Sequence, residues 1–204
     1  MESIISPDQL NTLMHNRRSV FPQDYTGESV DDAIVRQILE NARWAPTHKF
    51  TEPWRFIVFT GDGIKTFAKF QSDLYRKVTE ADGSFKERNY ENLLTKPAMS
   101  SHVIVVIMKR DERKSLPEIE EAGAVFCAVQ NMYLTASAYG VGCYLSTGGV
   151  TYFEETKSFF GLEAEDRIIG FFYIGVPKRI NSTSRRKPLA EVSEWVTTAE
   201  TPDA

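Results

Sequence analysis

Three nearly continuous apolar segments constrain the fold of this 204-residue chain more than any other feature. Residues 102–109 read HVIVVIMK, residues 168–176 read IIGFFYIGV, and residues 54–60 read WRFIVFT. Short runs rich in β-branched and aromatic residues are typical of strands that are buried on both faces. They predict a central sheet with a covering layer on each side.

Amphipathic helical stretches alternate with these strands. The first helix is expected over about residues 7–16, and a second over about 30–44 with Ser29 as its N-cap. Further helices are expected over about 64–79, 85–94, 119–139 and 152–160, with a short strand at 143–146. We find no repeat or long linker. The pattern predicts a single α+β domain, residues 1–204, with three layers (α/β/α).

Composition excludes several classes of protein. Lys and Arg number 24 against 28 Asp and Glu, which gives a formal net charge of −4 and disfavours binding of nucleic acid through bulk charge. No apolar run approaches the roughly 20 residues of a membrane span, and the N-terminus MESIISPDQL has no apolar signal segment. We therefore expect a cytoplasmic protein with neither a membrane nor a nucleic-acid partner.

The cysteines and acidic residues suggest no metal centre. Cys127 and Cys143 form no CxxC pair and have no histidine at ligand spacing, so they are interpreted as two small buried residues in a reducing compartment. The acidic run Glu118, Glu120 and Glu121 is interpreted as the solvated start of a helix.

Two compact basic clusters lie near opposite ends of the chain. Arg17-Arg18-Ser19 follows the first predicted helix, and residues 184–189 read SRRKPL. Guanidinium groups beside a hydroxyl suit an anionic oxygen cluster such as a phosphate. Taken alone, the first cluster is more typical of cations at a helix C-terminus, and the second is as typical of a solvated patch. Together, in an acidic chain, they favour a phosphate clamp.

Two loop segments have the composition of ligand-binding sites. Residues 45–54 (APTHKFTEPW) form a polar loop between two prolines, where His48 offers a donor and Trp44 a flat apolar face. A structural turn explains this loop equally well. Residues 140–149 (GVGCYLSTGG) follow a predicted helix and carry Leu145 where a dinucleotide fingerprint needs its third glycine. The Ser146–Gly149 portion would let backbone N–H groups approach a ligand, although a tight turn is slightly favoured for this segment alone.

Taken in order, these segments resemble the nitroreductase family of flavin-dependent oxidoreductases over nearly the whole chain. The resemblance rests on the RRS tripeptide at 17–19, the AP…PWRF block at 45–56, the helix and turn at 121–142, FFYIGVP at 171–177, and RKPL at 186–189. His48-Lys49 after Ala45-Pro46 is further similar to the small bacterial YdjA-like subgroup of minimal nitroreductases.

The resemblance implies a nitroreductase-like fold with a mostly antiparallel sheet, and a homodimer that binds FMN at its interface. Residues of both chains would contribute to each site, with Trp44 and His48 reaching the flavin from the partner. The cofactor-binding residues it implies are Arg17, Arg18, Ser19, Trp44, His48, Leu145, Ser146, Thr147, Gly148, Arg186 and Lys187. The arginines, the lysine and Ser19 would hold the phosphate region. Leu145 to Thr147 would line the isoalloxazine, with a backbone N–H near Thr147 or Gly148 facing the reactive N5.

The implied activity is two-electron transfer with ping-pong kinetics. NADH or NADPH would reduce FMN, and a small acceptor such as a nitroaromatic, a quinone or an enone-like compound would then bind the same flavin face. No catalytic side chain is assigned. Many family members have a basic residue where Phe21 stands, Asn at Phe50 and Gln at Glu52, and these usually serve the pyrimidine edge of the flavin. The negative charge of reduced flavin must be stabilised from elsewhere, with Arg18 or His48 as candidates.

Two alternatives remain at this stage. One is another flavin enzyme on the same fold, such as an oxidase or a dehalogenase. The other is a non-catalytic dimer that binds flavin or a phosphorylated ligand in its clefts.

Overall fold

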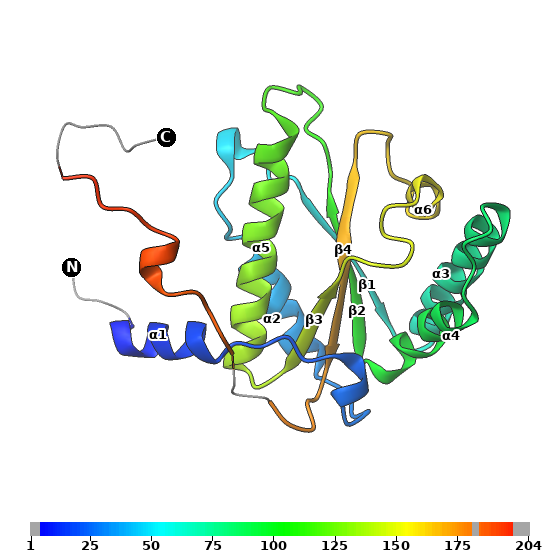
Figure 1. Ribbon diagram of the computed structural model, residues 1–204, viewed down its shortest axis with the longest axis horizontal. Coiled ribbons are helices and arrows are strands. Elements are labelled where there is room, and N and C mark those ends of the chain that lie inside the picture. Colours follow the sequence, from blue (N-terminus) through cyan, green and yellow to red (C-terminus); the bar gives the residue numbers. More distant parts are fainter. Residues whose placement is uncertain (1–4, 181–183, 198–204) are drawn as a thin grey trace.

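A four-stranded antiparallel sheet forms the centre of the molecule (Figure 1). The computed structural model describes residues 5–180 and 184–197. The strands lie in the order β1-β2-β4-β3, and every neighbouring pair is antiparallel. Their bounds are Trp54–Thr60 for β1, His102–Met108 for β2, Gly142–Ser146 for β3 and Arg167–Gly175 for β4. Each predicted strand is present within one residue of its expected ends, so the α+β prediction is confirmed.

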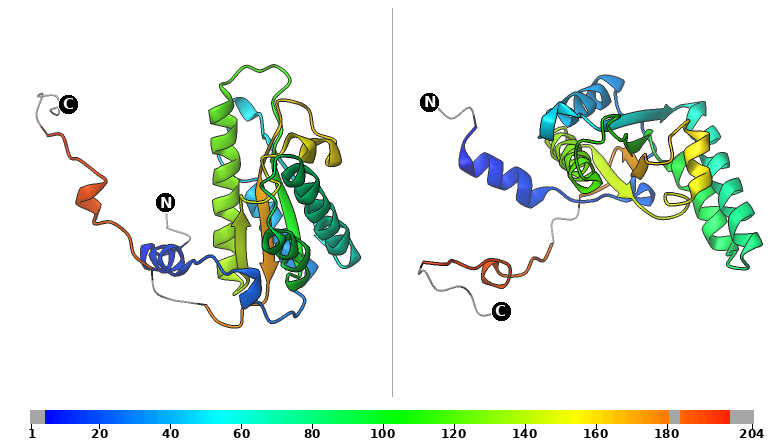
Figure 2. Two further views of the ribbon diagram at one scale, coloured as in Figure 1. Left: turned by 45° about the vertical axis from the view of Figure 1, so that its right-hand side comes forward. Right: turned by 90° about the horizontal axis from the view of Figure 1, so that it is seen from above.

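Helices cover both faces of the sheet, as the three-layer prediction requires (Figures 1 and 2). One face carries α2 (Asp32–Ala42) and α5 (Glu118–Ala138), and the other carries α3 (Asp62–Ala81), α4 (Glu87–Thr95) and α6 (Glu154–Phe159). Helix α1 (Pro7–Asn16) projects beside α5. Four short 3-10 turns complete the described elements: η1 Pro22–Asp24, η2 His48–Phe50, η3 Pro97–Met99 and η4 Leu189–Glu191.

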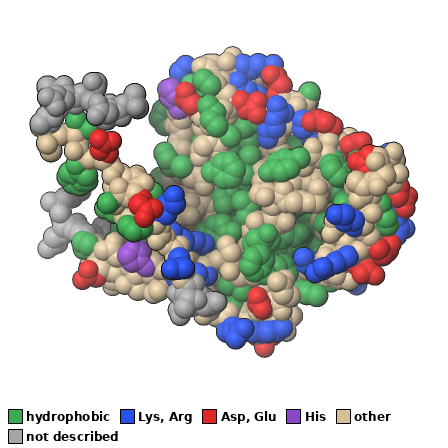
Figure 3. Space-filling view, viewed as in Figure 1, with side chains coloured by type: hydrophobic (Ala, Val, Ile, Leu, Met, Phe, Trp, Pro, Cys, Tyr) green, Lys and Arg blue, Asp and Glu red, His purple; other side chains and the backbone are tan. Residues whose placement is uncertain are grey.

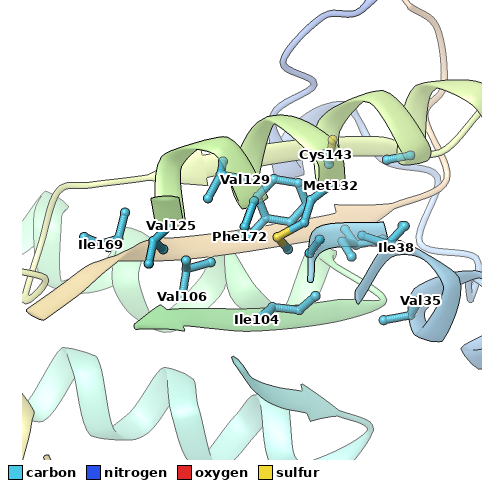
Figure 4. Packing of buried hydrophobic residues seen from close by; sticks show 14 of the residues in the cluster. Val35, Ile38, Ile104, Val106, Val125, Val129, Met132, Cys143, Ile169 and Phe172 are labelled. Carbon is cyan, nitrogen blue, oxygen red and sulfur yellow. The ribbon is translucent and has the colours of Figure 1, made fainter. Parts of the chain in front are cut away.

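Two hydrophobic cores form because successive strand residues point to opposite faces. On β2, Ile104 and Val106 pack toward α2 and α5, whereas Val103 and Val105 pack toward α3. Figure 4 shows the first core, in which Phe172 of β4 meets residues of α5. Each fully buried side chain of this size contributes about 2 kcal/mol. Strands β2 and β4 are therefore buried over almost their whole length.

Local capping explains where the first two helices begin. The Ser6 hydroxyl accepts the Gln9 N–H at the start of α1, and the predicted bounds of that helix are confirmed. Helix α2 starts at Asp32, two residues later than predicted, and its N-cap is Asp31 rather than Ser29. The Asp31 carboxylate accepts the Ala33 N–H at 2.8 Å, whereas the Val30 N–H donates to the hydroxyl of Ser101, just before the central strand β2.

Two interpretations of α5 are wrong. Glu121 is buried, not solvated, because it forms an ion pair with Arg110 and accepts the Asp111 N–H at 3.0 Å. Cys127 is exposed on the outer face of α5, whereas Cys143 on β3 is buried as expected. The exposed stripe of α5 also includes Ile119 and Phe126, so the helix has a second apolar face that the sheet does not cover.

Among the described residues, no helix combines the length and apolarity needed to cross a bilayer. The segment 184–197 extends away from the body on the same side as α1 (Figure 2). Its apolar side chains Leu189, Val192 and Trp195 are exposed.

Candidate functional site

The segment that follows α1 runs along the free edge of β3. The Val20 N–H donates to the Cys143 carbonyl at 2.9 Å, and the Phe21 ring lies 4.5 Å from that of Tyr144. These contacts continue the sheet by a few residues. As a result, the basic tripeptide at 17–19 lies alongside the glycine-containing strand that the sequence singled out.

Tyr133 of α5 joins these two predicted segments. Its hydroxyl accepts the Leu145 N–H at 2.7 Å and hydrogen-bonds with Ser19, while the Arg17 guanidinium lies 5.0 Å from the centre of its ring. Burial raises the pKa of the Tyr133 hydroxyl, so the group stays neutral and able to donate. Sequence reasoning missed Tyr133, because no motif distinguishes it from other apolar positions of the helix.

Arg18 takes a different role from its neighbour. Its Nη1 donates to the His15 carbonyl at 2.5 Å and to the Arg17 carbonyl at 2.8 Å. The guanidinium therefore serves the C-terminal end of α1, which is the alternative that the tripeptide alone favoured.

A polar pocket opens where β3 ends, on the α3 and α4 side of the sheet. Its volume is about 330 Å³. The predicted residues Ser146 and Gly148 line it, and Thr147 lies between them in the chain. The remaining lining residues are Gln71, Tyr75, Asn89, Asn92, Leu93, Lys96, Gly149, Phe171 and Tyr173. None of the α3 and α4 residues was predicted, because their polar side chains resemble those of an ordinary solvated helix.

The turn at Gly148–Gly149 is shaped for a close backbone approach. Gly149 has φ of 64°, and a Cβ there would lie 2.8 Å from the Leu93 side chain. Gly148 has open space around the position of a Cβ. The Thr151 hydroxyl donates to the Gly148 carbonyl at 2.7 Å and holds the turn in place. A ligand can thus reach the backbone of Gly148 without meeting a side chain there.

Gln71 borders this pocket and carries a buried acceptor without a partner in the described part of the chain. The residue is fully buried, and its Nε2 donates to the Leu93 carbonyl at 2.5 Å. Its Oε1 has no hydrogen-bond partner among the described residues. A buried carbonyl oxygen without a partner is costly, so a ligand N–H at this point would be stabilised. Lys96 supplies a cation at the rim of the same pocket.

The loop residue His48 lies at the other end of α5, whereas Trp44 follows α2 beside Asn41, which hydrogen-bonds with Asn131 and Thr135 of α5. His48 Nδ1 is 2.6 Å from Glu120 Oε2, and the Trp44 Nε1–H donates to Glu40 Oε1 at 3.1 Å. Glu120 and Tyr133 are thirteen positions apart on one helix, which corresponds to about 20 Å at 1.5 Å per residue. Within one chain, the structure therefore does not bring His48 to Ser19.

Arg186 and Lys187 also stand apart from the body. The Arg186 Nη1 donates to Ser184 Oγ at 2.6 Å and to the Arg185 carbonyl at 2.8 Å, both within the extended segment 184–197. In the space-filling view this segment and α1 stand off from the body, and apolar side chains gather over the middle of the face (Figure 3). No group of three or more His, Cys, Asp or Glu side chains within residues 5–180 and 184–197 is placed to hold a metal ion.

Comparisons with known proteins agree on one family. The model of the nitroreductase family matches residues 14–176. YfhC of Bacillus subtilis is 28% identical over 93% of this chain and 95% of its own. YdjA of Escherichia coli is 31% identical over 86% of this chain and 92% of its own. Both relatives are named as NAD(P)H nitroreductases.

Solved structures show the same architecture. A nitroreductase-like protein from Bacillus cereus has a TM-score of 0.79 at 26% identity, covering 97% of this chain and 100% of its own. A nitroreductase from Desulfovibrio desulfuricans, solved in complex with FMN, has a TM-score of 0.67 at 27% identity, covering 98% of this chain and 99% of its own.

Proposed function

Because the chain belongs to the nitroreductase family of oxidoreductases, we propose that it is an FMN-dependent NAD(P)H oxidoreductase. The observation that carries the proposal is the pocket at the end of β3, where an orphaned buried acceptor, a cation and a glycine turn meet beside a basic segment. The names of both curated relatives and the FMN complex of the Desulfovibrio protein support it.

The pocket fits the pyrimidine edge of a flavin. That edge carries one N–H donor between two carbonyl oxygens. The Gln71 Oε1 would accept the N–H, and the Lys96 ammonium would donate to a carbonyl and stabilise negative charge there. These two residues would replace the polar contacts that Phe21 and Phe50 cannot make.

The phosphate of FMN would bind at the segment 17–19, which lies beside Tyr133. Arg17 and Ser19 would bind phosphate oxygens, since both side chains already face the Tyr133 ring and hydroxyl. Arg186 or Lys187 would complete this clamp when the segment 184–197 folds against the body of one chain or the other. Arg18 would act mainly through the end of α1.

Residues 145–148 would position the ring system. Leu145 and Ser146 would lie along it, and a backbone N–H of Thr147 or Gly148 would point at its reactive nitrogen. When bound, FMN would supply the two-electron redox chemistry, while the chain binds it and orients its exposed face. A nicotinamide donor and a nitroaromatic or quinone acceptor would share that face, which predicts ping-pong kinetics.

We infer that two copies complete each site. The exposed stripe of α5, with Ile119, Phe126 and Cys127, is suited to packing against its own copy about a two-fold axis. The middle of the stretch between Glu120 and Tyr133 falls at Phe126 and Cys127. Antiparallel packing there would bring His48 and Trp44 of one chain to the pocket of the other. A cytoplasmic location remains a prediction from composition.

The first test is the visible spectrum of the purified protein. We expect a yellow protein that releases FMN on denaturation and bleaches when NADH or NADPH is added without air. Steady-state plots at several acceptor concentrations should then give the parallel lines of a ping-pong reaction. A colourless protein that also fails to take up added FMN would reject the proposed function. Bound FMN that no nicotinamide reduces would instead indicate an oxidase or a flavin-binding protein.

A further inference from the structure

The η2 turn is held in a conformation that is unfavourable for its residues. Lys49, Phe50 and Glu52 have φ of 52°, 53° and 43°, in the left-handed region that disfavours side chains with a Cβ. Such strain persists only where surrounding contacts determine the backbone, and it concentrates at functional sites.

One hydrogen bond within the loop and two contacts at and just before the start of α5 hold this turn in place. The Thr47 hydroxyl accepts the Glu52 N–H at 3.1 Å, and the Lys49 ammonium donates to the Ser115 carbonyl at 3.2 Å. The contact of His48 with Glu120, at 2.6 Å, ties the turn to the helix itself. These contacts define how the turn is oriented on the surface.

The turn exposes the aromatic ring of Phe50 to solvent. Phe50 is 87% exposed, the highest value for a large apolar side chain in the described part of the chain, and the nearby Trp44 is 75% exposed. Water around a free phenyl ring is unfavourable, and the strained backbone adds to that cost. Neither cost is offset by contacts that Phe50 makes inside this chain, so the ring is suited to a contact outside it.

The two-fold packing of α5 determines where the ring would go. It would bring η2 toward the partner's β3 end and pocket, because the midpoint between Glu120 and Tyr133 falls between Phe126 and Cys127 of the exposed stripe. The ring offers no hydrogen bond, so it recognises flat apolar surfaces by stacking or edge contact.

We propose that Phe50 is a specificity-determining residue that forms one wall of the partner's acceptor site and selects flat aromatic acceptors over non-aromatic ones. This inference rests on the proposed function. The ligand class is a planar ring that accepts two electrons, such as a nitroaromatic or a naphthoquinone. Phe50 contacts the acceptor and holds no proton or electron itself.

The test isolates the oxidative half-reaction. Holoenzyme is reduced with dithionite, and its reoxidation is followed by stopped flow with a naphthoquinone, with 4-nitrobenzoate and with ferricyanide. Phe50→Leu keeps apolar bulk without the ring, and Phe50→Tyr keeps the ring. We expect F50L to lower the rate constant for both aromatic acceptors by about three- to tenfold, the range of an aromatic contact, with ferricyanide unchanged and F50Y close to the native rate.

Phe159→Ala on α6 is the matched control, because it removes another partly exposed ring far along the chain from η2. It should leave the ratio of aromatic to ferricyanide rates unchanged. Equal losses for all three acceptors in F50L, or no loss, would overturn the proposal for Phe50 while leaving the flavin assignment intact. Failure of the native protein to bind FMN would overturn both.

Hybrid dimers test whether Phe50 acts on the partner's pocket. In the first hybrid, one chain carries Arg17→Ala with Ser19→Ala and the other carries F50L. In the second, all three changes lie on one chain. If Phe50 acts across the interface, the first hybrid keeps one fully native site and the native acceptor preference, and the second does not. The reverse result would show that Phe50 acts within its own chain and would overturn the proposal.

Discussion

The two ends of α5 carry groups of opposite character. At the N-terminal end, a strained turn projects the apolar ring of Phe50 outward. At the C-terminal end, Tyr133 is bonded to the β3 backbone beside a concave polar pocket. Glu120, which contacts the turn, and Tyr133, which contacts β3, are about 20 Å apart along the helix, so the turn does not reach the Tyr133 end within a chain. Each end is understood best as half of a site that a second copy completes.

Removing the buried ion pair near the N-terminal end of α5 should have the largest effect on stability. Glu121→Ala removes a buried carboxylate that pairs with Arg110 and accepts the Asp111 N–H. We expect the free energy of unfolding to fall by about 3 kcal/mol, measured by urea denaturation, because the groups it satisfies lose their partner.

The neighbouring glutamate provides the control for that variant. The His48 and Glu120 side chains are 58% and 42% exposed, so Glu120→Ala should change the free energy of unfolding by less than about 1 kcal/mol. Equal losses in the two variants would contradict the view that the buried pair, rather than the surface pair, supports this end.

Changing Arg17, which lies beside Tyr133 near the C-terminal end of α5, should weaken cofactor binding and leave folding unchanged. Arg17→Ala should raise the FMN dissociation constant by about ten- to a hundredfold, measured by quenching of flavin fluorescence, because it removes charge-assisted hydrogen bonds to phosphate. Lys65→Ala is the control, since that ammonium pairs with Asp62 on the surface of α3. Unchanged FMN affinity in the Arg17 variant would show that the phosphate assignment is wrong.

The smallest expected effect is a dependence of the free energy of unfolding on pH that comes from Cys143 of β3. Burial raises the pKa of its thiol from 9.0 to about 12. The unfolded chain therefore loses this proton at lower pH than the folded one, and stability should fall as pH rises from 9 toward 12.

For the thiol alone, the free energy of unfolding should be about 1 kcal/mol lower at pH 10 than at pH 8. Burial also raises the pKa of the hydroxyls of Tyr25 and Tyr173, which act in the same direction, so the comparison is made with Cys143→Ser. If the free energy of unfolding of the native protein and of the variant depended on pH in the same way, the thiol would make no such contribution.

Local signals were sufficient for most of the fold. Pro7 and the apolar face of residues 10–14 predict the bounds of α1, and the apolar runs predict β1, β2 and β4 within one residue. The start of α2 was predicted two residues early. Val30 suits a helix by periodicity, but its N–H donates to the Ser101 hydroxyl just before β2. Glu121 was misjudged for the same reason: its partner, Arg110, lies beyond a loop.

The candidate site was predicted only in part. Arg17, Ser19 and residues 145–148 were identified by their types and order, and they do lie together along β3. Tyr133, Gln71 and Lys96 could not be identified, since each looks like an ordinary helical position in the sequence. The order of the motifs also did not indicate that His48 lies far from Arg17 and Ser19 within one chain.

The order of residues by itself determined which segments are strands, which are helices, and where basic and glycine-rich clusters lie, because those properties depend on neighbours within a few positions. The tertiary structure decided which side chains meet. The pairing of residues 17–21 with the edge of β3, the approach of α3 and α4 to the end of that strand, and the distance between the two ends of α5 all depend on how the layers pack. Packing of this kind joins residues far apart in the chain, and no local pattern encodes it.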